Sequence, residues 1–186
     1  EMEKINLRQA KLIGVIGSAL SIIGSILASF SLSIGGINAS ILIILFVASS
    51  ILTLIAIKGI SQETKVQKIF SFYLVGFILF VVGIVLFTVS QRGPTTSQVF
   101  SVLISISSYA IVVISAYYTK RSFDIISIVL NNHYFKVVGM LLFVGTITVV
   151  NAAYNFVTLI RAILELFAFL GIPNEFEMSP QTEKLE

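Results

Sequence analysis

The sequence predicts an all-α integral membrane protein. We expect a helical bundle of six transmembrane helices, with five as the alternative count, plus one interfacial amphipathic helix. Apolar residues make up 56% of the chain and charged residues only 11%, and the mean hydropathy is +1.02. A typical soluble domain is roughly 45–50% apolar and about 25% charged, so this chain has too few charges to cover a surface facing water. These values exclude a soluble globular domain, a disordered chain and a nucleic-acid-binding module.

Four uninterrupted apolar runs have the length needed to cross a bilayer. The hydrocarbon core is about 30 Å thick, which takes about 20 residues of helix. The runs are apolar throughout rather than alternating, and open sheet edges are not tolerated in lipid, so these segments are not strands. The four predicted spans are Leu12–Ile34, Ile37–Ile57, Ile69–Val89 and Val99–Tyr118.

The apolar stretch Val137–Gly171 admits two interpretations. It can form two short spans that turn at Asn151–Asn155, which gives six spans in total. It can also form one span, Val137–Ile160, followed by an interfacial helix, which gives five. In the six-span arrangement Arg161 and Glu165 lie near the middle of the last span, where charges are costly.

The segment 119–132, between the fourth and fifth predicted spans, is amphipathic. Lys120 and Asp124 fall on one helical face, and Phe123 and Ile126 fall on the other. A helix of this kind lies in the membrane interface with its apolar side among the lipid headgroups. We therefore expect a separate connector on the cytoplasmic side, with a gate or a partner-docking helix as the functional alternative.

The length of the chain leaves room for one bundle and no sizeable extramembrane domain. We expect residues 1–172 to form a single transmembrane bundle that includes the connector. Residues 173–186 then form an acidic C-terminal tail. Its acidic residues are Glu175, Glu177, Glu183 and Glu186.

Basic residues in the loops predict the orientation. Nine of them precede the first span or lie between spans two and three and between spans four and five, whereas the opposite side has Arg92 alone. Cytoplasmic loops are enriched in Lys and Arg, so we expect a multi-pass protein of the cell membrane with a cytoplasmic N-terminus. Aromatic residues such as Tyr73 and Tyr117 are expected at the same interface. The nine basic residues are Lys4, Arg8, Lys11, Lys58, Lys65, Lys68, Lys120, Arg121 and Lys136.

Small residues recur on one face of the first predicted span. Helices in lipid associate through such residues and through polar side chains, because lipid tails are as apolar as leucine. We expect this face to pack against other helices inside the bundle, with a contact to a protein partner or a second copy of the chain as the functional alternative. The face consists of Gly14, Gly17, Ser21, Gly24 and Ala28. Other spans offer Ser49, Ser50 and Thr53, Gly76 and Gly83, and Ser101, Ser105, Ser108 and Ser115.

Arg161 and Glu165 are the charges that can lie deep in the membrane. They are four residues apart on one helical face, so they can form an ion pair. An intramembrane ion pair suggests a proton or ion relay, or a lock to another helix. The alternative is a short last helix that places both charges at an interface.

Residues typical of catalysis or metal binding are scarce. The chain has no cysteine and a single histidine, His133, which we expect to be solvated in a loop. No paired carboxylates, Ser/His/Asp set or glycine-rich phosphate loop is evident. We expect no enzyme activity, no catalytic residues, and no cofactor-binding or metal site.

Several short motifs are spread along the chain. They are Asn6–Lys11, Lys58–Thr64 with Ile69–Phe70, Tyr118–Phe123, Phe135–Gly139 and Ala168–Pro173. Together they resemble an archaeal family of small multi-pass membrane proteins that is catalogued as a domain of unknown function. The resemblance extends from about Asn6 to Pro173. It implies an archaeal cell membrane and a compact helical bundle, and it carries no activity, cofactor or site residues.

The leading functional hypothesis is a non-catalytic accessory or assembly subunit, or a homo-oligomeric membrane component. Its partners are the lipid bilayer and other proteins or copies of itself, and no nucleic acid is expected. The alternative is a small transporter or channel for ions or small solutes that uses the Arg161/Glu165 pair. A subunit would turn its small-residue face outward, whereas a transporter would turn polar stripes inward around a cavity.

Overall fold

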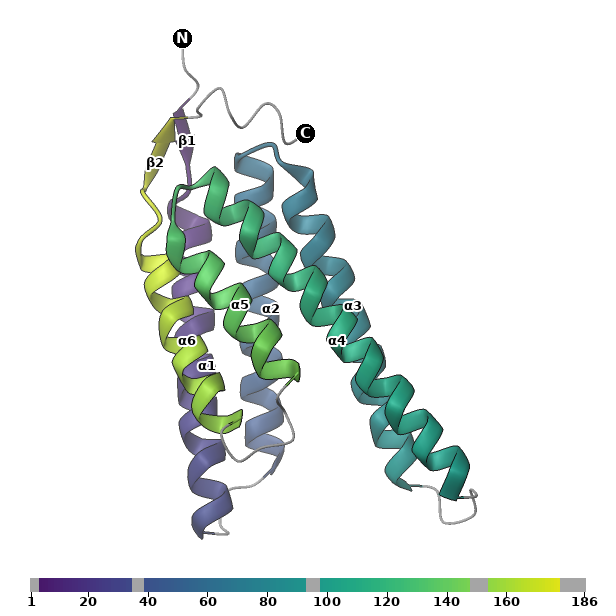
Figure 1. Cartoon of the computed structure of the whole chain (residues 1–186). Coiled ribbons are helices and arrows are strands. Elements are labelled where there is room, and N and C mark those ends of the chain that lie inside the picture. The colour runs from purple at the N-terminus through teal and green to yellow at the C-terminus, as the bar shows by residue number, and fades with distance from the viewer. Residues whose placement is uncertain (1–3, 35–38, 93–97, 148–153, 178–186) are drawn as a thin grey trace.

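The fold is an all-helical bundle, as predicted. A computed structural model describes residues 4–34, 39–92, 98–147 and 154–177 (Figure 1). These residues form six helices and two short strands. The helices are α1 (Arg8–Ile34), α2 (Ala39–Glu63), α3 (Gln67–Arg92), α4 (Gln98–Val129), α5 (His133–Ile147) and α6 (Tyr154–Leu170), and the strands are β1 (Lys4–Asn6) and β2 (Glu175–Glu177).

The six helices form a closed ring. Each helix packs against the next in the sequence, and α6 returns to pack against α1. Successive helices run in opposite directions, so the chain passes up and down the bundle (Figure 1). The ring therefore encloses a central space to which every helix can contribute side chains.

The prediction of six transmembrane helices, the last two of them short, exceeds the number of membrane-spanning helices in the described part of the chain. Four of its helices are long and apolar enough to cross a membrane, namely α1, α2, α3 and α4. Helix α5 has 15 residues and α6 has 17. At 1.5 Å per residue they span about 22 and 26 Å, less than the hydrocarbon core of about 30 Å. The apolar stretch 137–171 is divided between two short helices, and most of the predicted turn at Asn151–Asn155 lies outside the described residues.

A two-stranded ribbon joins the ends of the described chain. Strand β1 pairs antiparallel with β2, so that Lys4 lies opposite Glu177 and Asn6 opposite Glu175. This pairing places the first and the last described residues at the same end of the bundle (Figure 1). The single span Val137–Ile160 of the five-span alternative is wrong, because its described residues belong to two antiparallel helices, α5 and α6 (Figure 1). The acidic tail begins as strand β2, and residues 178–186 lie outside the described part.

The separate interfacial helix predicted for residues 119–132 is also wrong. Helix α4 continues without a break from Gln98 to Val129 and includes most of this segment. Phe123 and Ile126 are fully buried within the protein. The apolar side of the segment is therefore covered by α3 and α5 rather than by lipid headgroups, while Lys120 and Asp124 form an ion pair at 2.6 Å.

The hydrophobic core is concentrated at the end of the bundle that carries the termini. Phe135 contacts Phe123 and Phe169 with ring centroids 5.9 and 5.3 Å apart. Buried Leu7, Ile57 and other side chains complete the same cluster. We call this region the closed end, because large side chains fill the centre of the ring there.

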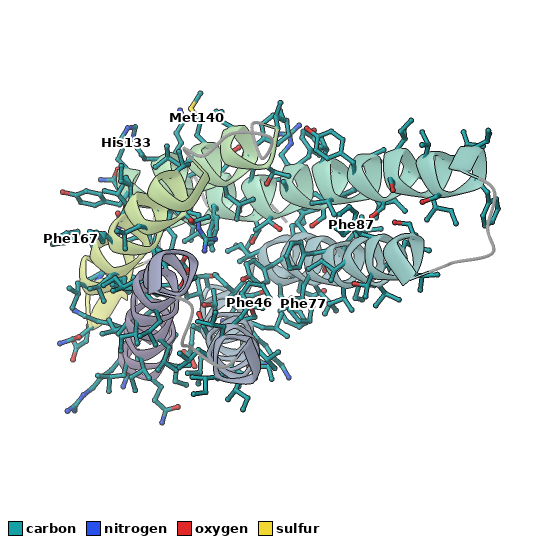
Figure 2. The ribbon with its side chains drawn as sticks, turned by 90° about the horizontal axis from the view of Figure 1, so that it is seen from below. Phe46, Phe77, Phe87, His133, Met140 and Phe167 are labelled. Atoms are coloured by element: carbon teal, nitrogen blue, oxygen red, sulfur yellow. The ribbon has the colours of Figure 1, made fainter. Side chains whose placement is uncertain are left out.

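Helices α3 and α4 form a hairpin that leaves the bundle at the other end. Seen from that end, the hairpin stands apart from the other four helices (Figure 2). Two short connections join it to them, and each contains a residue with positive φ, Lys65 at 60° and Asn131 at 48°. The hairpin is therefore a distinct unit attached at the closed end.

Regularly spaced serines bind α4 to α3 and form what we call the serine ladder. Four hydroxyls seven residues apart on α4 each donate to a backbone carbonyl on α3. The acceptors are also seven residues apart, in the reverse order, as expected for antiparallel helices that cross at a small angle. The pairs are Ser101 with Ser90, Ser108 with Gly83, Ser115 with Gly76 and Ser122 with Ile69, at 3.0, 2.5, 2.8 and 2.7 Å.

Replacing Gly76 by alanine should destabilise the hairpin. A Cβ atom at this position would lie 3.0 Å from the Ser115 carbonyl oxygen, a backbone atom that cannot move without disturbing the ladder. We expect Gly76→Ala to lower the free energy of unfolding by about 1–3 kcal/mol. The matched control is Gly24→Ala, where the nearest atom, Leu45 Cβ, lies at an ordinary 3.7 Å. Denaturant titration of both detergent-purified variants measures the difference, and equal stability would contradict the ladder's importance.

Candidate functional site

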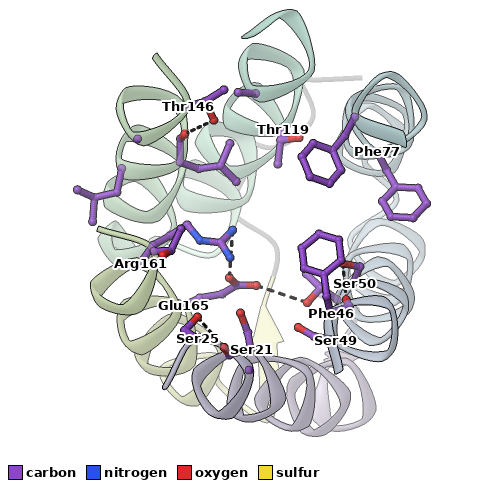
Figure 3. A pocket seen from close by; sticks show the side chains of 18 of the residues that line it. Ser21, Ser25, Phe46, Ser49, Ser50, Phe77, Thr119, Thr146, Arg161 and Glu165 are labelled. Atoms are coloured by element: carbon purple, nitrogen blue, oxygen red, sulfur yellow. Dashed lines mark hydrogen bonds and ion pairs between the residues drawn. The ribbon is translucent and has the colours of Figure 1, made fainter. Parts of the chain in front are cut away.

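A cavity of about 400 Å³ occupies the centre of the helical ring (Figure 3). All six helices contribute to its wall. This volume falls within the roughly 300–1,000 Å³ typical of small-molecule sites. Its polar lining residues are Ser21, Ser25, Ser49, Ser50, Thr53, Tyr73, Ser115, Thr119, Thr146, Thr158, Arg161 and Glu165.

Arg161 and Glu165 are the charged residues of the cavity wall in the described part of the chain. Both project from α6 into the cavity (Figure 3). Arg161 Nη1 lies 3.9 Å from Glu165 Oε2, and their side chains are 24% and 5% exposed. The expected pair therefore exists, but this distance exceeds the roughly 2.7–2.9 Å of a charge-assisted hydrogen bond. The two groups attract each other across a gap.

The hydrogen-bonding capacity of this pair is only partly used inside the protein. Glu165 Oε1 accepts a long hydrogen bond from the Thr53 hydroxyl at 3.5 Å. The buried Nε of Arg161 has no hydrogen-bond partner among the described residues. A guanidinium has five N–H donors in a planar fork, so Arg161 retains donors for a ligand with acceptor oxygens.

Hydroxyl groups in the wall present mainly acceptor oxygens. Ser49 donates to the carbonyl of Gly17 at 2.9 Å, and Ser50 and Thr146 donate to carbonyls in their own helices at 2.8 and 2.7 Å. A hydroxyl that donates its proton in this way still has lone pairs. These oxygens can accept hydrogen bonds from a ligand with N–H groups.

An aromatic surface lies opposite the charges. Phe46 lies across the cavity from Arg161 (Figure 3). Its ring packs against Phe80 with centroids 5.9 Å apart, and Phe77 lines the same region. One side of the cavity can therefore bind charged or polar groups while the other contacts an apolar body.

The small-residue face of the first span points into the bundle. Gly14 packs so closely against Phe169 that a Cβ atom there would overlap the ring, and a Cβ atom at Gly17 would lie 3.2 Å from the Thr53 hydroxyl. Ser21, Gly24 and Ala28 line the cavity. The outward face expected of an accessory subunit is thus not formed by these residues.

The sequence analysis did not identify several other residues of the cavity. Tyr73, expected at the membrane interface, lines the cavity, as do Phe46 and Thr146. Helices apolar on all sides give no periodic signal that separates an inward phenylalanine from an outward one.

His133 is exposed on the outer face of α5 (Figure 2). Within the described ranges, no group of three or more His, Cys, Asp or Glu side chains could hold a metal ion.

Neutralising the two charges should have unequal effects. Arg161→Gln leaves a carboxylate that is 5% exposed without its counter-ion, whereas Glu165→Gln leaves a guanidinium that is 24% exposed. We expect Arg161→Gln to cost about 1–3 kcal/mol of stability, Glu165→Gln less, and the double variant less than the sum. Denaturant titration in detergent measures all three. Strict additivity would show that the two charges do not interact.

One archaeal protein with no described activity is similar over nearly the whole chain. It is an uncharacterized protein of Methanocaldococcus jannaschii, 28% identical over 189 residues that cover 95% of this chain and 98% of the relative. No family model matches the chain, and no solved structure matches it. Such a relative agrees with the archaeal part of the resemblance, and the particular family stays a prediction. The helices and the relative together describe a helical membrane protein similar to an archaeal one.

Proposed function

We propose that the protein is a membrane carrier that binds a small solute in the central cavity. The observation that supports this proposal is the inward polar lining, to which all six helices contribute and in which Arg161 and Glu165 are the charges. Charged side chains within membrane proteins commonly line substrate or ion pathways. An accessory subunit would need no such cavity.

The shape of the bundle supports access from one end. Aromatic and aliphatic side chains fill the ring at the closed end, and the α3–α4 hairpin diverges from the other helices at the opposite end (Figures 1 and 2). A carrier must expose its site to one side of the membrane at a time. The arrangement fits one such state, with rocking of the hairpin about Lys65 and Asn131 as the movement that would change access.

The distribution of charge supports a cytoplasmic location for the closed end. Strands β1 and β2 and the connections at 64–66 and 130–132 lie there. The basic residues Arg8, Lys58, Lys68, Lys120 and Lys136 belong to the same end. Because cytoplasmic loops are enriched in Lys and Arg, we infer a cytoplasmic N-terminus in the cell membrane. The cavity would then open toward the outside.

Transport can be tested by obstructing the cavity. We expect proteoliposomes to take up at least one class of radiolabelled amino acids, carboxylic acids or sugars faster than empty liposomes. Ser21→Trp should abolish this uptake, because Ser21 lines the cavity (Figure 3). The control is Ser107→Trp, the same change at an exposed serine on the outer surface of α4, which should leave uptake intact.

Absence of uptake for every class would contradict the carrier. Native mass spectrometry of protein extracted from its source membranes would then decide the remaining hypothesis. A stoichiometric assembly with other polypeptides, or with further copies of the chain, would support the accessory or homo-oligomeric component.

Orientation can be tested with single cysteines, because the natural chain contains none. Gln9→Cys, Gln62→Cys and Glu175→Cys place exposed thiols at the closed end, and Val99→Cys places one at the other end of α4. We expect a membrane-impermeant maleimide to label Val99→Cys in intact cells and the other three only after lysis. Labelling of all four from one side would contradict the inferred topology.

A further inference from the structure

The charges of the cavity limit the kind of ligand that it can bind. Arg161 and Glu165 are separated by 3.9 Å, and the other lining side chains of the described chain are uncharged at neutral pH. With both groups ionised, the site carries one positive and one negative charge and no net charge. Removing one partner of a buried ion pair is strongly unfavourable, because the other charge is left uncompensated.

A ligand with a single charge would create this imbalance. An anion on Arg161 competes with Glu165 for the guanidinium and leaves the carboxylate, which is 5% exposed, without a counter-ion. A cation on Glu165 leaves Arg161 in the same position. A ligand that brings one charge of each sign gives each side chain a partner and keeps the site neutral.

We propose that the cavity binds a small zwitterion, an α-amino acid with an apolar side chain. This inference rests on the proposed function and specifies its substrate class. The carboxylate of the ligand accepts hydrogen bonds from the terminal N–H groups of Arg161, which lines the cavity. The ammonium group lies at Glu165 and donates to the oxygen atoms of nearby hydroxyl groups such as Thr53.

The remainder of the cavity fits the apolar part of such a ligand. Phe46 and Phe77 lie on the side away from Arg161, where an aliphatic side chain would replace lipid or water against the rings (Figure 3). The volume of about 400 Å³ is sufficient for an amino acid of the size of leucine. The charged end of the ligand therefore faces α6 and its apolar end faces α2 and α3.

Equilibrium binding to the detergent-purified protein tests the ligand class. Three probes share one carbon skeleton: L-leucine, isocaproate, which is leucine without its ammonium group, and isopentylamine, which is leucine without its carboxylate. We expect L-leucine to bind at least about tenfold more tightly than either analogue, since each analogue leaves one protein charge unpaired.

Variants that neutralise one charge of the pair should prefer a singly charged analogue to L-leucine. In Glu165→Gln the ammonium group loses its partner and meets only the positive Arg161, so isocaproate should bind more tightly than L-leucine. In Arg161→Gln isopentylamine should bind more tightly than L-leucine. A merely structural role would weaken all three probes together. The matched controls are Arg8→Gln and Glu63→Gln, the same changes at exposed residues outside the cavity, which should keep the natural order.

The other outcomes either overturn the zwitterion site or overturn the carrier, and they distinguish the two. Equal affinity for the three probes, no binding of any, or preference of the natural protein for one singly charged analogue excludes a zwitterion site. Displacement of L-leucine by phosphatidylethanolamine at lower concentration than by free amino acids would assign the charge pair to a lipid headgroup. Binding with the expected exchange of preference but without uptake into proteoliposomes would retain the ligand class and exclude the carrier. Uptake of other solutes without binding of L-leucine would retain the carrier and exclude the zwitterion site.

Discussion

The structure depends on the fact that helices in lipid gain little by burying one leucine against another. Association must come from close backbone contact and from hydrogen bonds between helices. The serine ladder supplies both, because Gly76 and Gly83 bring the backbone of α3 against α4 and the serine hydroxyls donate across the contact. Gly14 has a comparable role between α1 and α6, where Phe169 fills the space left by its missing side chain.

The ring is packed shut at one end only, and the cavity lies in the remainder of its centre. The cluster around Phe135 joins α4, α5 and α6 where the termini meet, and the strand ribbon ties the first helix to the last. Polar side chains from all six helices face the centre of the ring. Polar groups in lipid are unfavourable without partners, so the ring provides the environment in which Arg161 and Glu165 are tolerated.

The errors of the sequence analysis have physical causes. The segment 119–132 is amphipathic, but amphipathicity does not distinguish a helix covered by lipid headgroups from one covered by α3 and α5. The number of spans was overestimated because hydropathy measures apolar length without showing where a helix begins or ends. The spacing of the small residues on α1 could not show whether they meet another protein or, as Gly14 and Gly17 do, helices α6 and α2.

The sequence by itself determined the helical membrane class, the excess of basic residues at one end and the spacing that lets Arg161 and Glu165 interact, because composition, charge count and helical period are local properties. Only the tertiary structure decided that α5 and α6 are short, that the serines of α4 meet carbonyls of α3, and that polar side chains from six helices surround one cavity. These features depend on which face of each helix packs against its neighbours. Helices apolar on every side leave that choice to the complementary packing of side chains far apart in the sequence.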